Sequence, residues 1–324
     1  MISIIVPYKN PMPFFKDCIE SVINQNYSNF QLILVSDHSC EESKSIALKY
    51  AKKDPRVQCL DCKGKGIIDA LIDGSSKAKG DFITRMDADD LMREDKLLLM
   101  RNQLKSKGKG HVCIGGVKYF ASGKNLENGY IKYENWLNKL TFNEENFSEI
   151  FKECIVPSSC WMIYMNDFKK INQFNDLEYP EDYDFAFQLW KNSFKVTSVK
   201  EKIHLWRDHY KRTSRNSSIY NFENFIDLKL KYFIDKEKKE EETIVLWGAG
   251  KKGKTLAKKL INKKQSFYWI TENIKKINKE IYDVTIEDTT LLEKEFKKII
   301  ICSISDPLFK IPSNDKMNRF ISFY

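Results

Sequence analysis

Three aspartates, Asp87, Asp89 and Asp90, stand within four positions, directly after the apolar segment 82–86. Carboxylates this close repel one another, so a chain that keeps them needs a compensating charge. A divalent cation supplies it, since carboxylate oxygens are ligands that Mg²⁺ and Mn²⁺ prefer. Side chains two positions apart on an extended chain point to the same side, which suits Asp87 and Asp89 to one ion. The alternative is an exposed acidic loop in which Asp89 or Asp90 caps a helix that begins near Leu91.

The N-terminal part of the chain alternates between strand and helix patterns. Apolar runs predict strands at 3–8, 30–35, 57–60 and 82–86, and helical spacing of apolar residues predicts helices at 12–25, 42–53 and 67–79. This order predicts an α/β fold with a mixed, mostly parallel sheet and helices on both faces. Such sheets bind ligands beyond the carboxyl ends of their strands. The residues at those ends should therefore meet in one crevice: Pro7, Tyr8, Asp37 and the segment from Asp87.

The middle of the chain has a less regular pattern. It predicts strands at 112–117, 160–164 and 196–199, and helices at 142–151 and 181–192. Because Pro180 precedes the second of these helices, Glu181 and Asp182 should lie in its first turn. The helix dipole alone favours acids there. The same pair is also a candidate for a general base, and the two interpretations are compatible.

Composition narrows the class of protein. The chain has 324 residues, 42% hydrophobic and 31% charged, which indicates a globular protein long enough for two domains. Its net charge of +9 comes from lysines mixed with acids. We expect no nucleic-acid partner, because no recognised module interleaves basic and aromatic residues. Weak attraction to anionic lipid or phosphorylated substrates is the alternative meaning of this charge.

The sequence has no recognisable signal for secretion or membrane insertion, and its cysteines do not form a zinc motif. No apolar run is long enough to cross a bilayer, and the N-terminal segment lacks the basic start of a signal peptide. Of eight cysteines only Cys59 and Cys62 form a CxxC pair, without the further ligands that zinc requires. We therefore expect a cytoplasmic protein with reduced thiols.

Four segments, taken together, resemble the family 2 glycosyltransferases with a GT-A fold. They are ISIIVPYKN, FQLILVSDHS, AKGDFITRMDADD and Glu181-Asp182-Tyr183, and the resemblance runs from Met1 to about Ser214. It implies a metal-dependent transfer of a sugar from a nucleotide-diphosphate donor, a UDP-sugar, in surface polysaccharide synthesis. The implied acceptor is a glycan or a lipid-linked sugar, which would bring the protein to the inner face of the membrane as a peripheral protein. The oligomeric state stays open.

The resemblance implies donor-binding roles for four residues, and electrostatics adds a fifth. Pro7 and Tyr8 match the segment that lines the nucleotide base. Asp37 matches the acid that accepts a hydrogen bond from the uracil ring, and Asp87 the acid that reaches the ribose or the metal. Arg207 can stabilise the negative charge that develops on the leaving diphosphate.

The same resemblance implies which residues bind the metal and which residue acts as the catalytic base. Asp89 matches the direct ligand of Mn²⁺ or Mg²⁺, with Asp87 beside it, and His209 matches a late motif that closes over metal and diphosphate. Asp182 matches the catalytic base, with Glu181 as the second candidate. The acceptor hydroxyl must lose a proton during attack, and one carboxylate on the opposite side can take it. A single base with direct displacement predicts an inverting transferase.

Two other functions compete with this one. A nucleotidyltransferase combines a similar sheet with metal-binding acids, but it would require a glycine-rich basic loop where residues 8–13 read YKNPMP. An inactive nucleotide-binding scaffold is the other alternative, and the presence of Asp87, Asp89 and Asp182 argues against it. Acidic pairs also serve glycoside hydrolases, which have no need for the D-x-D spacing.

The C-terminal part predicts a separate small module. A charged run suggests a GT-A domain at 1–235, a linker at 236–242 and a Rossmann-like βαβ module at 243–324. Strands are expected at 243–247, 267–271 and 298–302. Three glycines fit G-x-G-x-x-G between the first strand and a helix, and an acid follows the second strand where a ribose ligand would stand. These four residues define a possible second nucleotide site: Gly248, Gly250, Gly253 and Glu272. The alternative is that the module has a structural or docking role.

Overall fold

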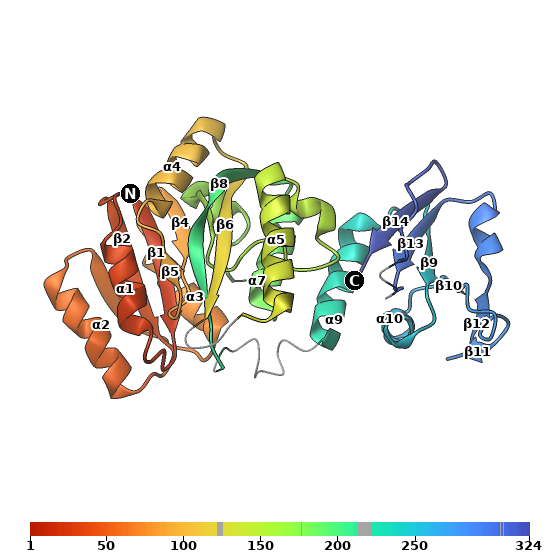
Figure 1. Cartoon of the computed structure of the whole chain (residues 1–324), viewed down its shortest axis with the longest axis horizontal. Helices are drawn as coiled ribbons and strands as arrows, with labels where there is room; N and C mark the ends of the chain where they lie inside the picture. The colour runs from red at the N-terminus through yellow and green to blue at the C-terminus, as the bar shows by residue number, and fades with distance from the viewer. Residues whose placement is uncertain (122–125, 176, 211, 213–221, 305, 307) are drawn as a thin grey trace. The chain divides into compact units, whose positions relative to one another are not determined.

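The computed structural model describes residues 1–121, 126–175, 177–210, 212, 222–304, 306 and 308–324. The chain forms two compact units, each with its own sheet (Figure 1). The first unit consists of Met1–Ser148 and Ile155–Ser217, and the second of Glu149–Cys154 and Ser218–Tyr324. The domain boundary at 236–242 stays a prediction, and Ser214, the expected end of the family resemblance, lies outside the described residues.

The first unit contains a mixed sheet of eight strands. They are β1 (Ile2–Tyr8), β2 (Phe30–Ser36), β3 (Val57–Asp61), β4 (Phe82–Arg85), β5 (Leu91–Met92), β6 (His111–Ala121), β7 (Trp161–Tyr164) and β8 (Lys195–Asp208). Their order is β3-β2-β1-β4-β7-β6-β8-β5. Strands β3, β2, β1 and β4 are parallel, β6 and β8 are parallel, and β7 runs antiparallel to both of its neighbours. The predicted α/β class with a mixed, mostly parallel sheet is confirmed.

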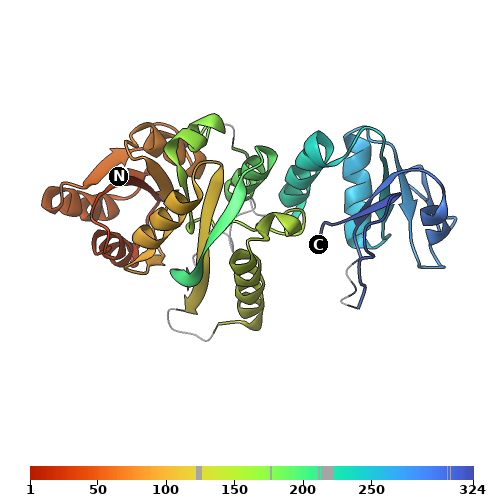
Figure 2. The same ribbon diagram turned by 90° about the horizontal axis from the view of Figure 1, so that it is seen from above.

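Helices lie on both faces of this sheet, as the view in Figure 2 shows. They are α1 (Phe15–Ile23), α2 (Glu41–Lys53), α3 (Ile67–Ser76), α4 (Lys96–Lys107), α5 (Asn128–Asn143), α6 (Met165–Lys170) and α7 (Glu181–Lys191), with a 3₁₀ turn η1 (Asn146–Glu149). The helix predicted at 142–151 is wrong. Glu144 adopts a left-handed backbone with φ of 61°, which ends α5, and its carboxylate accepts a hydrogen bond from Ser198 N at 2.9 Å.

The register of the central strands determines at which edge of the sheet the candidate site lies. Every residue of β1 is buried, as expected for a parallel strand covered on both faces. Tyr8 pairs with Ser36 and Ile5 pairs with Arg85, so β1, β2 and β4 end at the same edge of the sheet. Strand β8 is longer than the predicted segment 196–199 and pairs Leu205 with Leu91 of β5. The chain that follows β4 therefore meets the far end of β8.

The second unit has a parallel sheet that is larger than expected. Its strands are β9 (Thr243–Trp247), β10 (Phe267–Ile270), β11 (Glu280–Ile281), β12 (Val284–Glu287), β13 (Lys298–Cys302) and β14 (Asn318–Ser322), and its helices are α9 (Phe222–Tyr232), the π-helical turn η3 (Phe233–Glu237), α10 (Lys251–Asn262) and the 3₁₀ turn η4 (Thr289–Glu293). The order is β11-β12-β10-β9-β13-β14, and β12, β10, β9, β13 and β14 are parallel. The chain moves outward from β9 in one direction and then returns to its other side. In the part of the chain that the structure describes, every helix is too short or too polar to cross a bilayer.

Candidate active site

Asp87 follows β4, and both of its carboxylate oxygens have partners. Arg85 Nη2 donates to Oδ1 at 2.7 Å, and Ser158 Oγ donates to Oδ2 at 2.8 Å. The backbone N–H of Asp87 donates to Ser159 Oγ at 2.8 Å. Burial by itself would raise the pKa of Asp87, but the Arg85 guanidinium and the two serine hydroxyls outweigh it and hold the pKa well below its usual range. Asp87 is therefore an anion in a fixed orientation.

Asp89 lies against His209. The distance from Asp89 Oδ2 to His209 Nε2 is 2.7 Å, and the His209 ring packs on Phe14 with ring centroids 4.8 Å apart. The Asp89 side chain is 28% exposed, so the pair is open to a ligand. Magnesium and manganese typically take one or two protein carboxylates and complete their shell with water and phosphate oxygens. The carboxylate and the imidazole fit that requirement. No cluster of three or more His, Cys, Asp or Glu ligands occurs among the described residues, so a donor diphosphate would have to complete the shell.

Asp90 is buried and joins the acidic segment to β8 and α4. Arg207 N donates to Asp90 Oδ1 at 2.8 Å, and Oδ2 lies 3.1 Å from His204 Nε2. His204 Nδ1 is 3.2 Å from Lys96 Nζ, which donates to the Ser159 carbonyl oxygen at 2.5 Å. Burial, followed by the nearby aspartate charges, raises the pKa of Asp90 well above its usual range. The sequence pattern alone did not predict this buried network, although a lysine at the start of an apolar helix was a signal for it.

Arg207 supports the backbone of the acidic segment. Its Nε donates to the carbonyl oxygen of Asp89 at 2.8 Å, and its Nη2 lies 3.2 Å from Asp17 Oδ2. The guanidinium carbon is 4.4 Å from the centre of the Phe14 ring and 4.8 Å from that of Phe120. Only 8% of the side chain is exposed. In this arrangement Arg207 holds the position of Asp89, and its predicted contact with a diphosphate stays a prediction.

Asp37 lies at the end of β2 with its carboxylate turned toward a glycine turn. Gly66 N donates to Oδ1 at 3.0 Å, and Lys9 Nζ lies 3.3 Å from Oδ2. Gly66 has φ of 99°, and a Cβ there would stand 2.8 Å from Tyr179 Oη, so only glycine suits this position. The backbone N–H of Asp37 donates to the Tyr8 carbonyl oxygen at 2.9 Å. The structure thus brings Asp37 to the end of β1, as expected.

Pro7 and Tyr8 complete this edge as buried residues of β1. The Tyr8 ring packs on Phe15 with centroids 4.5 Å apart, and burial raises the pKa of Tyr8 to about 12. Its phenol is therefore protonated at neutral pH. Since only 4% of Tyr8 is exposed, its side chain is part of the core beneath this edge of the sheet and does not project from it.

Glu181 and Asp182 occupy the first turn of α7 but differ in their surroundings. Arg85 Nη1 lies 3.3 Å from Glu181 Oε1, and both side chains are almost fully buried. Asp182 is half-buried, and Tyr183 N donates to its Oδ1 at 2.8 Å. Burial and then the Glu181 charge raise the pKa of Asp182 to about 7. Glu181 thus neutralises a buried arginine, while Asp182 can exchange a proton near neutral pH.

Arg85 therefore joins two parts of the site that are distant in sequence. Its guanidinium contacts Asp87 on one side and Glu181 on the other. Burial by itself would lower the pKa of Arg85, but these two acids raise it. Sequence analysis gave Arg85 no role, although an arginine inside an otherwise apolar strand was a signal that it pairs with buried acids.

The residues of the possible second nucleotide site lie in the second unit. Gly248 has φ of 119°, and a Cβ there would stand 2.7 Å from Ser303 Oγ. A Cβ on Gly253 would stand 1.9 Å from the Gly248 carbonyl oxygen, whereas one on Gly250 would meet no atom within 4 Å. Gly248 and Gly253 are thus needed for close packing of the loop, and Gly250 leaves the backbone open. Glu272 is exposed after β10.

Known structures share this architecture. TarS 1-349 of S. aureus in complex with UDP-GlcNAc matches with a TM-score of 0.57 and 16% identity, covering 80% of this chain and 71% of that chain. The mannosyltransferase PcManGT from Pyrobaculum calidifontis in complex with GDP-Man and Mn²⁺ matches with a TM-score of 0.52 and 14% identity, covering 72% and 63%. At these identities the likeness concerns the fold, and it confirms the expected GT-A architecture.

Sequence comparison identifies the family. An uncharacterized glycosyltransferase of Haemophilus influenzae is 39% identical over 235 residues, 68% of this chain and 93% of that protein. The uncharacterized glycosyltransferase EpsJ of Bacillus subtilis is 24% identical over 216 residues, and the match spans 64% of this chain but only 61% of EpsJ. The profile described as Glycosyl transferase family 2 matches residues 3–171, more than half of the chain. This protein therefore belongs to glycosyl transferase family 2.

Proposed function

We propose that this protein is a metal-dependent inverting glycosyltransferase that moves one sugar from a UDP-sugar to a hydroxyl group of a glycan or lipid-linked acceptor in surface polysaccharide synthesis. The observation that carries this proposal is the Arg85 bridge, which joins the D-x-D segment to the first turn of α7. It brings a metal-binding segment and a candidate base into one site. Work on a lipid-linked acceptor would place the protein at the cytoplasmic face of the membrane.

The donor nucleotide would lie along the ends of β1 and β2. After bonding to Gly66 N and Lys9, the Asp37 carboxylate retains lone pairs that can accept the N–H of a uracil ring. The UDP-GlcNAc in the TarS complex supports uridine as the nucleoside of the donor. The GDP-Man in the PcManGT complex makes guanosine the alternative. Pro7 and Tyr8 would form the floor beneath the base.

Asp89 and His209 would hold Mn²⁺ or Mg²⁺ beside the diphosphate. A cation bound there offsets the negative charge that develops on the leaving diphosphate. Asp87, whose oxygens already accept from Arg85 and Ser158, is better suited to a ribose hydroxyl than to a second direct metal bond. Arg207 keeps the Asp89 backbone in place through its Nε.

Asp182 would act as the base. The acceptor oxygen forms a bond to the anomeric carbon and gives its proton to the Asp182 carboxylate, while the bond from that carbon to the diphosphate oxygen breaks and its electron pair leaves with the diphosphate. Attack from the side opposite the leaving group inverts the anomeric carbon. Glu181 is the weaker candidate, because its carboxylate already contacts buried Arg85 at 3.3 Å.

Replacing Asp89 with alanine should abolish Mn²⁺-dependent hydrolysis of the donor, and His209→Ala should raise the Mn²⁺ concentration for half-activation by roughly 10- to 100-fold. Asp61→Ala is the matched control. Asp61 ends β3, which is separated from β4 by β2 and β1, and its side chain is 72% exposed, so the change should leave activation unchanged. Persistent metal-dependent turnover in Asp89→Ala would remove the metal-ligand assignment.

The donor itself is tested by slow hydrolysis of a panel of uridine, guanosine and cytidine diphosphate sugars. We expect turnover with a uridine donor and loss of the uridine preference in Asp37→Ala. Calorimetry with UDP, with and without Mn²⁺, separates this function from an inactive scaffold, which would bind without turnover. Release of pyrophosphate from a nucleoside triphosphate and a sugar phosphate would instead indicate a nucleotidyltransferase.

A further inference from the structure

We propose that the second unit binds a mononucleotide in a cavity at the carboxyl ends of β13 and β14, as a site of its own. The sheet order β12-β10-β9-β13-β14 reverses its direction between β9 and β13. In open parallel sheets this reversal is the place where ligands bind, because the loops on either side diverge and leave a crevice. The sequence alone predicted three of these strands and therefore no such reversal.

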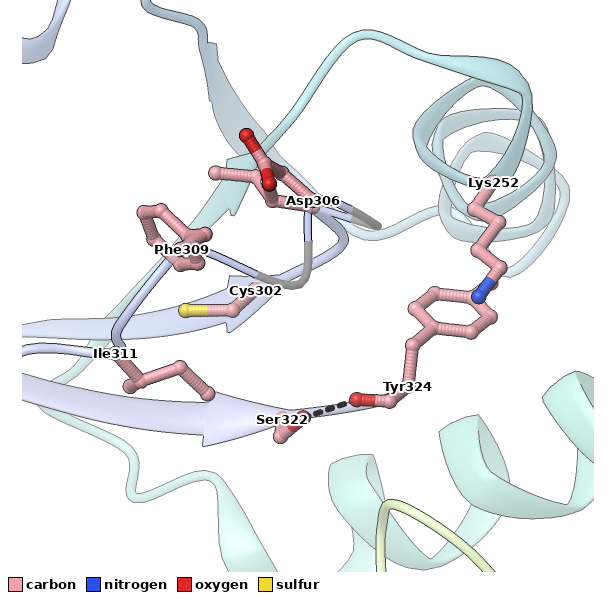
Figure 3. A pocket seen from close by; sticks show the side chains of 8 residues that line it. Lys252, Cys302, Asp306, Phe309, Ile311, Ser322 and Tyr324 are labelled. Atoms are coloured by element: carbon pink, nitrogen blue, oxygen red, sulfur yellow. Dashed lines mark hydrogen bonds between the residues drawn. The ribbon is translucent and has the colours of Figure 1, made fainter.

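A cavity of about 250 Å³ is present at this place (Figure 3). Phe309, Ile311 and Cys302 form an apolar wall, and Lys252 and Tyr324 stand across from them. Ser322 lies between the two walls with its hydroxyl donating to the Tyr324 carbonyl oxygen at 2.6 Å, and the lining is completed by Ile304 and Asp306. Ligand pockets usually measure about 300–1,000 Å³, and this cavity lies just below that range, so it limits the ligand to one nucleotide at most and excludes a dinucleotide.

The wall on the side of α10 carries positive charge. Lys252 is the second residue of α10, and its Nζ lies 4.1 Å from the centre of the Tyr324 ring. Among the described residues Lys252 forms no ion pair, so its ammonium group is available to an anion. The open backbone at Gly250, which caps the same helix, allows a phosphate to approach the first N–H groups of α10. An anionic group and a flat apolar ring are thus accommodated at opposite walls.

A buried donor beside the cavity lacks an acceptor. Trp247, the last residue of β9, packs edge-on against Phe309 with ring centroids 5.1 Å apart. Its Nε1–H is buried and has no hydrogen-bond partner within the described part of the chain. Trp247 is not among the residues that line the cavity, and its ring contacts the wall through Phe309, so this donor is not counted among the ligand contacts.

This cavity differs from the second site that the glycine motif suggested. Glu272, the predicted ribose ligand, is not among the residues that line it. Gly248 and Gly253 serve the packing of the loop, so Gly250 is the glycine that a ligand can use. The ligand would therefore lie on the side of β9 that faces β13. Residues on the other side, next to β10, would not contact it.

Calorimetric titration of the full chain with AMP and with UMP tests the proposal. We expect saturable binding of at least one of them, with adenosine or uridine and inorganic phosphate each binding more weakly. Lys252→Met should weaken binding roughly tenfold or more, because a charge-assisted contact is lost. Lys254→Met is the matched control, since it removes the same charge from an exposed position on α10 and should leave the affinity unchanged.

Three results would overturn the proposal. One is the absence of binding by both nucleotides. Another is an affinity that falls in Asp89→Ala and not in Lys252→Met, which would place the ligand in the first unit. The third is inorganic phosphate that binds as tightly as the nucleotides, because the apolar wall would then contribute nothing.

Discussion

The Asp182→Asn variant should lose sugar transfer, with kcat lower by roughly 10²- to 10⁴-fold, the usual contribution of a general base. Asparagine keeps the oxygen that accepts from Tyr183 N but cannot take a proton. Donor affinity should change little, since the role we propose for Asp182 concerns the acceptor. Steady-state kinetics with a saturating donor measure this, and an unchanged kcat would exclude Asp182 as the base.

The wild-type enzyme should show the same base in its pH profile. Because burial and the Glu181 charge raise the pKa of Asp182 to about 7, the carboxylate is mostly protonated at pH 6 and mostly ionised at pH 8. The rate of transfer should therefore rise with pH up to about 7 and then level off. A profile that is flat through this range would contradict the assignment.

The Asp182→Asn substitution should also stabilise the fold at alkaline pH. An acid whose pKa rises from 3.8 to about 7 on folding binds a proton more tightly in the folded state, so stability falls as pH increases between these two values. The Asp182→Asn change would remove that loss, which is on the order of a few kcal/mol above pH 7. Thermal unfolding should show a higher Tm than wild type at pH 8 and little difference at pH 4. Glu181→Gln is the matched control, and it should lower the Tm, because it deprives buried Arg85 of a charged partner.

Arg85→Met should be strongly destabilising, at about 3–5 kcal/mol, because it leaves the buried Glu181 and Asp87 without their cation. Activity should fall as well, since both acids would reorient or take up protons. Urea unfolding monitored by tryptophan fluorescence measures the stability, and donor hydrolysis measures the site.

Arg93→Met provides the comparison for Arg85. Arg93 also contacts two acids, Asp95 at 2.5 Å and Glu201 at 2.6 Å, but its side chain is 33% exposed. Solvent screens these contacts, so the loss should be about 0–1 kcal/mol. Similar losses in the two variants would mean that the Arg85 bridge is not the buried connection we describe.

The strands that hold the donor site could be recognised from sequence because their signals are local. A continuous apolar run is sufficient to predict β1, and the acids that follow β4 are adjacent in the chain. The predicted boundaries of helices and strands were wrong where contacts between residues distant in sequence determine them. No helix spans 142–151, a range that the structure describes in full, because Glu144 adopts a left-handed backbone, which ends α5, and its carboxylate accepts a hydrogen bond from Ser198 N on β8. The extent of β8 depends on pairing with β6 and β5 and not on its own composition.

By itself the sequence determined the family and the α/β class, and it indicated which residues are candidates to bind a metal or take a proton, since residue type, spacing and periodicity are properties of neighbouring positions. Only the tertiary structure decided which charges meet: that Arg85 bridges Asp87 and Glu181, that Asp90 turns inward to His204, and that Asp182 is left with a proton near neutral pH. The physical reason is that ion pairing and burial depend on distances across the sheet. Those distances follow from strand register and chain packing, which bring together residues as far apart in sequence as Asp90 and His204, separated by 114 positions.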